Sequence, residues 1–110
     1  MAPPPPGVSK KKHRIVEESL SSLVAAMAGV PGMRALFAQF NSSSALLVAL
    51  VESEYANRLV LNIEREYFMQ NPATPIDVQI HTIPAEDLER ELQILATAYV
   101  QLWADDAACR

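Results

Sequence analysis

The chain has 110 residues, enough for one domain, and its composition of 50% hydrophobic and 20% charged residues is typical of globular proteins. The single Cys109 excludes an intramolecular disulfide and a multi-cysteine zinc site. The longest apolar run, Ala45–Val51, is too short for a membrane span, and Pro3–Pro6 stand where a signal peptide would need apolar residues. These features predict an intracellular protein that does not bind membranes.

The net charge of −4 is unevenly distributed along the chain. Residues 1–40 hold five basic and two acidic side chains, whereas residues 41–110 hold four arginines and eleven acidic side chains. The basic excess is concentrated at residues 10–14 (KKKHR), which can neutralise phosphates, act as a nuclear-import signal, or form a solvated tail. Because four prolines precede this run, residues 1–11 are expected to be a disordered tail.

The first predicted element is an amphipathic helix over residues 12–28. Apolar side chains recur there every three or four positions, at Val16, Leu20, Leu23 and Met27. The sequence Gly29-Val30-Pro31-Gly32 ends this helix, since Pro31 cannot donate a backbone hydrogen bond and glycine permits a turn. The short apolar stretch Met33–Phe40 is compatible either with one or two helical turns or with a short strand.

The segment Ala45–Gln70 contains neither glycine nor proline, and we expect it to form one long central helix. Six residues fall within about one third of the helical circumference: Tyr55, Ala56, Leu59, Val60, Ile63 and Tyr67. A strand pattern competes locally, because Leu59, Leu61 and Ile63 alternate with their neighbours. The single helix is preferred because more positions fit it.

Two further elements follow. Apolar and polar residues alternate in Ile76–Ile83, which predicts an extended segment that needs a neighbouring strand. Pro84–Trp103 is expected to be the last helix, because proline suits a first turn and Leu88, Leu92, Leu95, Tyr99 and Leu102 recur every three or four positions. Residues 105–110 are expected to be a frayed acidic tail, which leaves residues 12–104 as a single domain.

Few residues have the surroundings that catalysis or metal binding requires. Neither His13 nor His81 has a second metal-ligating residue at a suitable spacing, and Cys109 lies near the chain end without a histidine partner. The acidic residues Glu86, Asp87, Glu89 and Glu91 are most simply a solvated helix face. The sequence therefore predicts a non-enzymatic protein with no metal, no cofactor and no small-molecule substrate.

The expected order of helix, loop, long helix, extended loop and helix resembles the histone fold. Phe40–Ala45 (FNSSSA), running into Ala49 and Leu50, is similar to the start of a histone central helix. Thr82–Leu88 (TIPAEDL) is similar to the second loop and the start of the last helix, and Asp87–Arg90 (DLER) resembles members of the centromere protein X type. The resemblance implies a mainly α subunit of three to four helices.

The same resemblance implies a function and a set of contact residues. The chain would pair with another small histone-fold-like subunit in a larger, nuclear, DNA-associated complex for repair, centromere assembly or transcription. DNA would be contacted by Lys10, Lys11, Lys12, Arg14 and Arg34. The partner interface would contain Leu47, Leu50, Val51, Tyr55, Leu59, Ile63, Ile80, Leu88, Leu92 and Tyr99.

A second architecture remains open at this point. The chain would be α+β, a four-stranded antiparallel sheet with flanking helices, if the strands were Met33–Phe40, Ala45–Val51, Arg58–Glu64 and Ile76–Ile83. This layout resembles the RWD-type interaction modules, whose Tyr-Pro-x-x-Pro signature is loosened here to Tyr67, Pro72 and Pro75. It implies an adaptor or scaffold subunit that does not bind nucleic acid.

Overall fold

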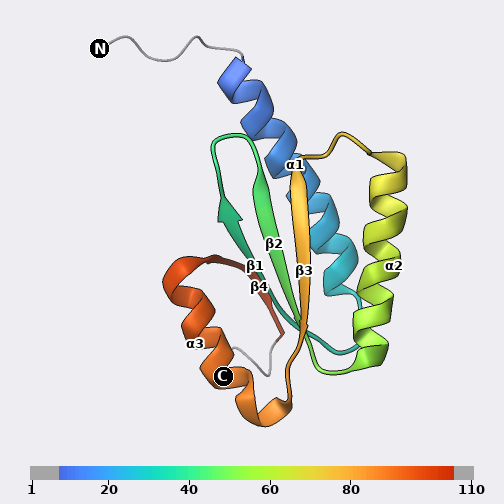
Figure 1. The fold of residues 1–110 in the computed structure, drawn as a ribbon, viewed down its shortest axis with the longest axis vertical. Coiled ribbons are helices and arrows are strands. Elements are labelled where there is room, and N and C mark those ends of the chain that lie inside the picture. Colours follow the sequence, from blue (N-terminus) through green and yellow to red (C-terminus); the bar gives the residue numbers. More distant parts are fainter. Residues whose placement is uncertain (1–7, 106–110) are drawn as a thin grey trace.

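The computed structural model describes the backbone of residues 8–105 and the side chains of residues 18–105. Seven helices and strands and one short 3-10 turn follow one another along these residues (Figure 1). They are α1 (Val8–Ala28), β1 (Met33–Phe40), β2 (Ala45–Val51), α2 (Glu54–Gln70), β3 (Ile76–Thr82), the 3-10 turn η1 (Ala85–Asp87), α3 (Leu88–Ala98) and β4 (Val100–Ala104).

The four strands form one mixed sheet in the order β3-β2-β1-β4. The hairpin of β1 and β2 is antiparallel, β4 pairs antiparallel with the other side of β1, and β3 pairs parallel with β2. Helices α1 and α2 cover one face of the sheet and α3 covers the other (Figure 1). The two crossover connections, through α2 and through α3, therefore lie on opposite faces.

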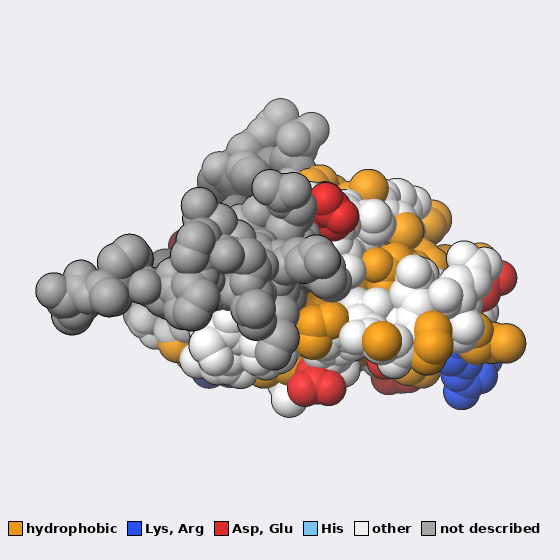
Figure 2. Space-filling view, turned by 90° about the horizontal axis from the view of Figure 1, so that it is seen from above, with side chains coloured by type: hydrophobic (Ala, Val, Ile, Leu, Met, Phe, Trp, Pro, Cys, Tyr) orange, Lys and Arg blue, Asp and Glu red, His pale blue; other side chains and the backbone are white. Residues whose placement is uncertain are grey.

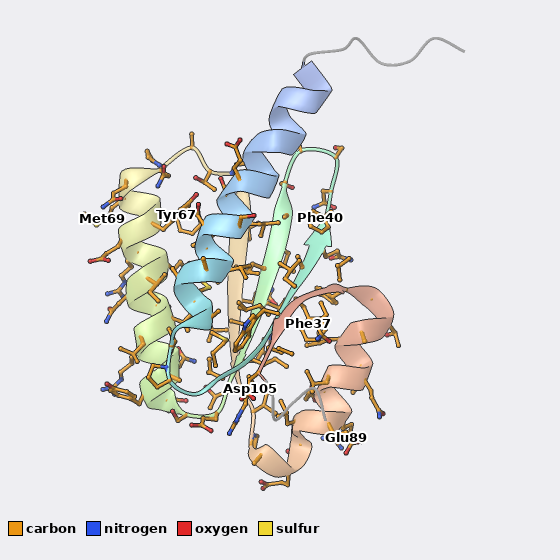
Figure 3. All side chains as sticks on the ribbon, turned by 180° about the vertical axis from the view of Figure 1, so that it is seen from behind. Phe37, Phe40, Tyr67, Met69, Glu89 and Asp105 are labelled. Carbon is orange, nitrogen blue, oxygen red and sulfur yellow. The ribbon has the colours of Figure 1, made fainter. Side chains whose placement is uncertain are left out.

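The two central strands are buried on both faces. Leu36 and Leu47 point toward α1 and α2 and are fully buried there. Phe37 and Val48 point to the other face, where they pack against α3 (Figure 3). Successive side chains of a strand alternate between faces, so a strand covered on both faces must be apolar throughout.

The structure is not a histone fold, and the predicted single helix over Ala45–Gln70 is wrong. Its first part is strand β2, and Ser53 then begins α2 by accepting a hydrogen bond on Oγ from the backbone N–H of Ala56, at 3.2 Å. A continuous apolar run fits a buried strand as well as a buried helix, and periodicity alone does not separate them. In the structure, helices cover both faces of the sheet at Ala45–Val51, so this apolar segment is stable as a strand.

The predicted last helix, Pro84–Trp103, is also wrong in its final quarter. Helix α3 ends at Ala98, Tyr99 is extended with φ −128° and ψ 156°, and Val100–Ala104 pairs with β1 as strand β4. Tyr99 and Leu102 keep the helical spacing of apolar residues, although they lie outside the helix. Tyr99 packs on the α3 face of the sheet and Leu102 on the face of α1 and α2, so their apolar character has another cause.

Of the two predicted architectures, the α+β alternative is closer to the structure. Its strands Met33–Phe40 and Ala45–Val51 are confirmed, and its Ile76–Ile83 strand exceeds β3 by one residue. Its strand over Arg58–Glu64 is wrong because that segment lies within α2, and the sheet is mixed rather than antiparallel. The fourth strand is β4.

The predicted first helix is confirmed over residues 12–28, and α1 begins earlier, at Val8. The predicted tails fall largely on residues 1–7 and 106–110, which lie outside the described residues. Among the described residues, no helix combines the length and the apolar character that crossing a membrane requires.

Replacing Leu47 by alanine should lower the free energy of unfolding by about 2–5 kcal/mol, because this fully buried side chain would leave a cavity between the sheet and α1. The control is Met69→Ala on the exposed side of α2, which should change it by less than about 0.5 kcal/mol. Urea unfolding followed by circular dichroism measures both. Equal losses in the two variants would contradict the burial of β2 between helices.

Candidate functional site

The basic residues predicted to contact DNA fall into two groups. Lys10, Lys11, Lys12 and Arg14 lie in the first turns of α1, where the backbone is described and the side chains are not. Their role in DNA binding stays a prediction. The histone-like pairing that was to present them to DNA is excluded, since the chain does not have that fold.

Arg34, the fifth predicted DNA contact, is held by two carboxylates. Its Nη1 donates to Asp105 Oδ2 at 2.8 Å, and its Nη2 pairs with Glu52. The backbone N–H of Asp105 also donates to the carbonyl of Arg34, at 2.9 Å. Arg34 therefore ties the beginning of β1 to the ends of β2 and β4 (Asp105 is labelled in Figure 3).

The residues predicted to face a partner are scattered over the structure. Leu47, Leu50 and Val51 are at most 1% exposed and lie in the centre of the sheet, so the chain itself covers them. Tyr55, by contrast, is 67% exposed at the first turn of α2. The other predicted interface residues are half-buried at the borders of the two cores: Leu59, Ile63, Ile80, Leu88, Leu92 and Tyr99.

The outer side of β3 is an open strand edge. The hydrogen bonds Ala45 N to Pro75 O and Ile83 N to Val51 O fix the parallel register with β2. In that register the N–H and C=O groups of alternate residues face β2, so those of Val78 and Ile80 face outward. Within the described part of the chain, no protein hydrogen bond reaches these outward groups.

Helix α2 lies beside this edge, on the side away from β2 (Figure 1). The helix is tied to the last residue of β3, where the side-chain amide of Asn57 donates to Thr82 Oγ1 at 3.2 Å. Toward the beginning of β3 the two elements separate and leave a groove of about 400 Å³. We call it the β3–α2 groove, and it is lined by Glu64, Arg65, Phe68, Thr74, Ile76, Asp77 and Val78.

Glu64 is the polar side chain of the β3–α2 groove whose ionisation the surroundings alter. Partial burial of its carboxyl group raises its pKa above the ordinary value of 4.5, and the neighbouring Arg65 opposes that rise. The ionised carboxylate is therefore incompletely solvated at neutral pH. A cation placed in the groove would stabilise it.

A second groove lies at the opposite edge of the sheet, between α1 and β4. It has a volume of about 370 Å³ and is mainly apolar, with Leu20, Ser21, Val24, Phe40 and Leu102 as its lining. One of its lining side chains, Phe40, is 41% exposed, and Val100 at the beginning of β4 is 54% exposed. Figure 3 shows Phe40 at the end of β1, beside α1. We call this the β4–α1 groove.

The remaining candidate residues do not converge. His81 lies exposed on β3, on the face that carries Asp77 and Gln79, and Cys109 lies outside the described residues. Within residues 18–105, no group of three or more histidine, cysteine or acidic side chains is placed to hold a metal ion. The described surface instead offers strand edges, one mainly apolar groove and one groove of mixed lining.

Comparisons with known proteins add no family. No protein-family model matches the chain, and searches of curated proteins and of solved structures find no significant match. The predicted membership of the histone-fold family is not supported by these comparisons, and the sheet topology contradicts it.

Sequence reasoning missed most residues of the two grooves. Leu20 belongs to the predicted apolar stripe of the first helix, but nothing in the sequence connects it with Phe40 and Leu102. Glu64 and Phe68 were placed on a central helix without a neighbouring strand edge. Ser53, a capping residue between two acidic residues, was the local signal that could have separated β2 from α2.

The open edge of β3 predicts an alternation in amide hydrogen exchange. The N–H groups of Asp77, Gln79 and His81 face β2 and should exchange at least tenfold more slowly than those of Val78 and Ile80. NMR-detected exchange at neutral pH measures this directly. Uniform protection along β3 would show that another element covers the edge.

Replacing Glu64 by glutamine should stabilise the fold at neutral pH. A carboxyl group whose pKa is raised on folding loses stability as the pH rises through that pKa, so the neutral amide removes the penalty. The gain over the native protein should vanish at about pH 3, where the glutamate is protonated in both states. Urea unfolding at the two pH values tests this, with the exposed Glu66→Gln on the same helix as a control expected to show no such gain.

Proposed function

We propose that this protein is a non-catalytic interaction module, an adaptor or scaffold subunit that binds another protein through the open edges of its sheet. The observation that carries the proposal is that each outer strand borders a groove: the groove beside β4 is mainly apolar, and the groove beside β3 combines apolar with charged side chains. An open strand edge offers unpaired N–H and C=O groups, and binding an extended segment of another chain satisfies them.

The character of the β3 edge favours this function. Proteins commonly protect an edge strand from other chains by making it short, bulged or rich in lysine and proline. Strand β4 has two of these devices, since it is five residues long and its pairing with β1 is irregular between Leu36 and Phe37. Strand β3 is seven residues long, pairs regularly, and contains neither lysine nor proline.

Exposed apolar side chains support the same proposal. Phe40 lines the β4–α1 groove and is 41% exposed, Val100 on β4 is 54% exposed, and Ile94 on α3 is 53% exposed. In the view of Figure 2, hydrophobic side chains interrupt the polar surface at several places, and few basic side chains are visible among the described residues. We also propose that the protein is intracellular, as predicted from its sequence, and that its partner is another intracellular protein.

The proposal predicts that blocking the edges abolishes partner binding. The full-length chain, tagged for affinity capture, should retain a partner protein in stoichiometric amounts from a lysate of its source cells, and the purified pair should re-form the complex. A variant with Val78→Pro and Val100→Lys should lose at least tenfold in affinity for that partner, because both edges are altered.

The matched control carries Tyr55→Ser and Met69→Lys, two exposed sites outside both groove linings, and should bind like the native protein. Figure 3 shows Met69 pointing away from the body of the fold. An equal loss in the control, or a complex unaffected by the edge variant, would refute binding through the sheet edges.

A further inference from the structure

The β3–α2 groove has the elements that an added strand requires. The outward N–H and C=O groups of Val78 and Ile80 supply a ladder of donors and acceptors along the edge. Half-buried apolar side chains on the α2 side of β3, together with Phe68, supply a surface for alternate side chains of the added segment. The hydrogen bond between Asn57 and Thr82 holds α2 to the last residue of β3, whereas the groove lies along the beginning of β3, from Thr74 to Val78.

The charges around the groove favour a basic segment. Residues 18–105 contain four arginines and no lysine, against eleven acidic residues. Arg34 is occupied by Glu52 and Asp105, and Arg90 lies 3.7 Å from a carboxylate oxygen of Asp87. The groove itself holds two carboxylates and one guanidinium, those of Glu64, Asp77 and Arg65.

The two carboxylates flank the place of an added strand from opposite sides. Ile76 and Val78 pack on the side of α1 and α2, so Asp77 between them points to the other face of the sheet. Glu64 projects from α2 and lines the groove on the first side. A lysine opposite Ile76 would lay its aliphatic stem along Phe68 toward Glu64, and a lysine opposite Asp77 would pair with that carboxylate.

We propose that the β3–α2 groove binds a single extended, basic segment of a partner protein, which adds to the sheet as a fifth strand next to β3. The inference rests on the proposed interaction function and specifies its site and the chemistry of its ligand. The segment alternates apolar side chains, opposite Val78 and Ile80, with polar ones, and carries lysine or arginine at the end near Ile76.

A second folded copy of this chain fits the site less well than a single segment. Helix α2 lies beside the edge of β3 in every copy, on the same side of the sheet as α1 (Figure 1). Pairing two β3 strands antiparallel would bring both α2 helices to the same face at the shared edge. An extended segment without a helix of its own avoids this overlap and is covered by α2 on one face.

The test uses the full chain and the synthetic peptide Ac-EVTVKKT-amide, designed to pair antiparallel with β3 so that its valines face Ile80 and Val78 and its lysines face Asp77 and Ile76. NMR titration should give saturable shifts centred on the amides of Val78 and Ile80. The same peptide N-methylated at both valines cannot donate toward β3 and should bind at least tenfold more weakly. Equal binding of the two peptides, or no saturable shift on β3, overturns the proposal.

Two variants separate the backbone and charge contributions. Val78→Pro removes an outward N–H that β2 does not use, so the fold should persist while the peptide affinity falls at least tenfold, and Val78→Thr keeps the N–H and should bind normally. Glu64→Gln should weaken binding about threefold, as expected for a partly exposed ion pair, and added salt should reduce this difference. Unchanged affinity in both Val78→Pro and Glu64→Gln refutes the site even if a peptide binds elsewhere.

Separate variants distinguish a failure of the β3 site from a failure of the proposed interaction function. If the captured partner is lost on Val100→Lys and not on Val78→Pro, the chain is an interaction module that uses the β4 edge, and the proposed β3 site fails alone. Light scattering of the isolated chain adds one more test. A dimer that Val78→Pro converts to a monomer would assign the β3 edge to self-association and overturn the proposed ligand.

Discussion

The fold depends on the need to cover a hairpin that is apolar on both faces. Strand β2 contains only alanine, leucine and valine, and β1 carries Leu36 and Phe37 on opposite faces, both fully buried. A two-layer arrangement would leave one of these faces in water, at a cost of about 25 cal/mol for each Å² of apolar surface. The chain therefore places α1 and α2 on one face and α3 on the other.

The two covers are unequal. On the side of α1 and α2, helix residues such as Leu23, Met27 and Val60 are fully buried. Helix α3 has no buried residue, and its apolar stripe, which includes Leu88, Leu92 and Leu95, is only half-covered. At the end of the sheet where β1 begins and β2 and β4 end, Arg34 pairs with the carboxylates of Glu52 and Asp105. Helices on both faces leave the two strand edges as the least covered parts of the sheet.

These edges connect the architecture with the proposed function. An interaction through a strand edge uses backbone groups for affinity and alternate side chains for specificity, so it requires no convergent catalytic residues. Helix α2 gives the β3 edge an additional wall, with Phe68 and Glu64 in positions to contact an added strand. Residues 18–105 carry more acidic than basic side chains, so the surface around the groove also attracts a basic ligand.

The sequence by itself determined the elements with a clear period. The stripe of Leu20, Leu23 and Met27 predicted α1, and the alternation from Ile76 predicted β3. Tertiary structure alone decided the state of Ala45–Val51, since an apolar run has no period that distinguishes a helix from a strand buried on both faces. It also decided β4, because the helical spacing from Leu88 runs on through Leu102, and only the free edge of β1 makes the strand favourable there. The β3–α2 groove was beyond sequence reasoning for the same physical reason: it is formed by the distance between a helix and a strand edge, which packing sets and local sequence does not.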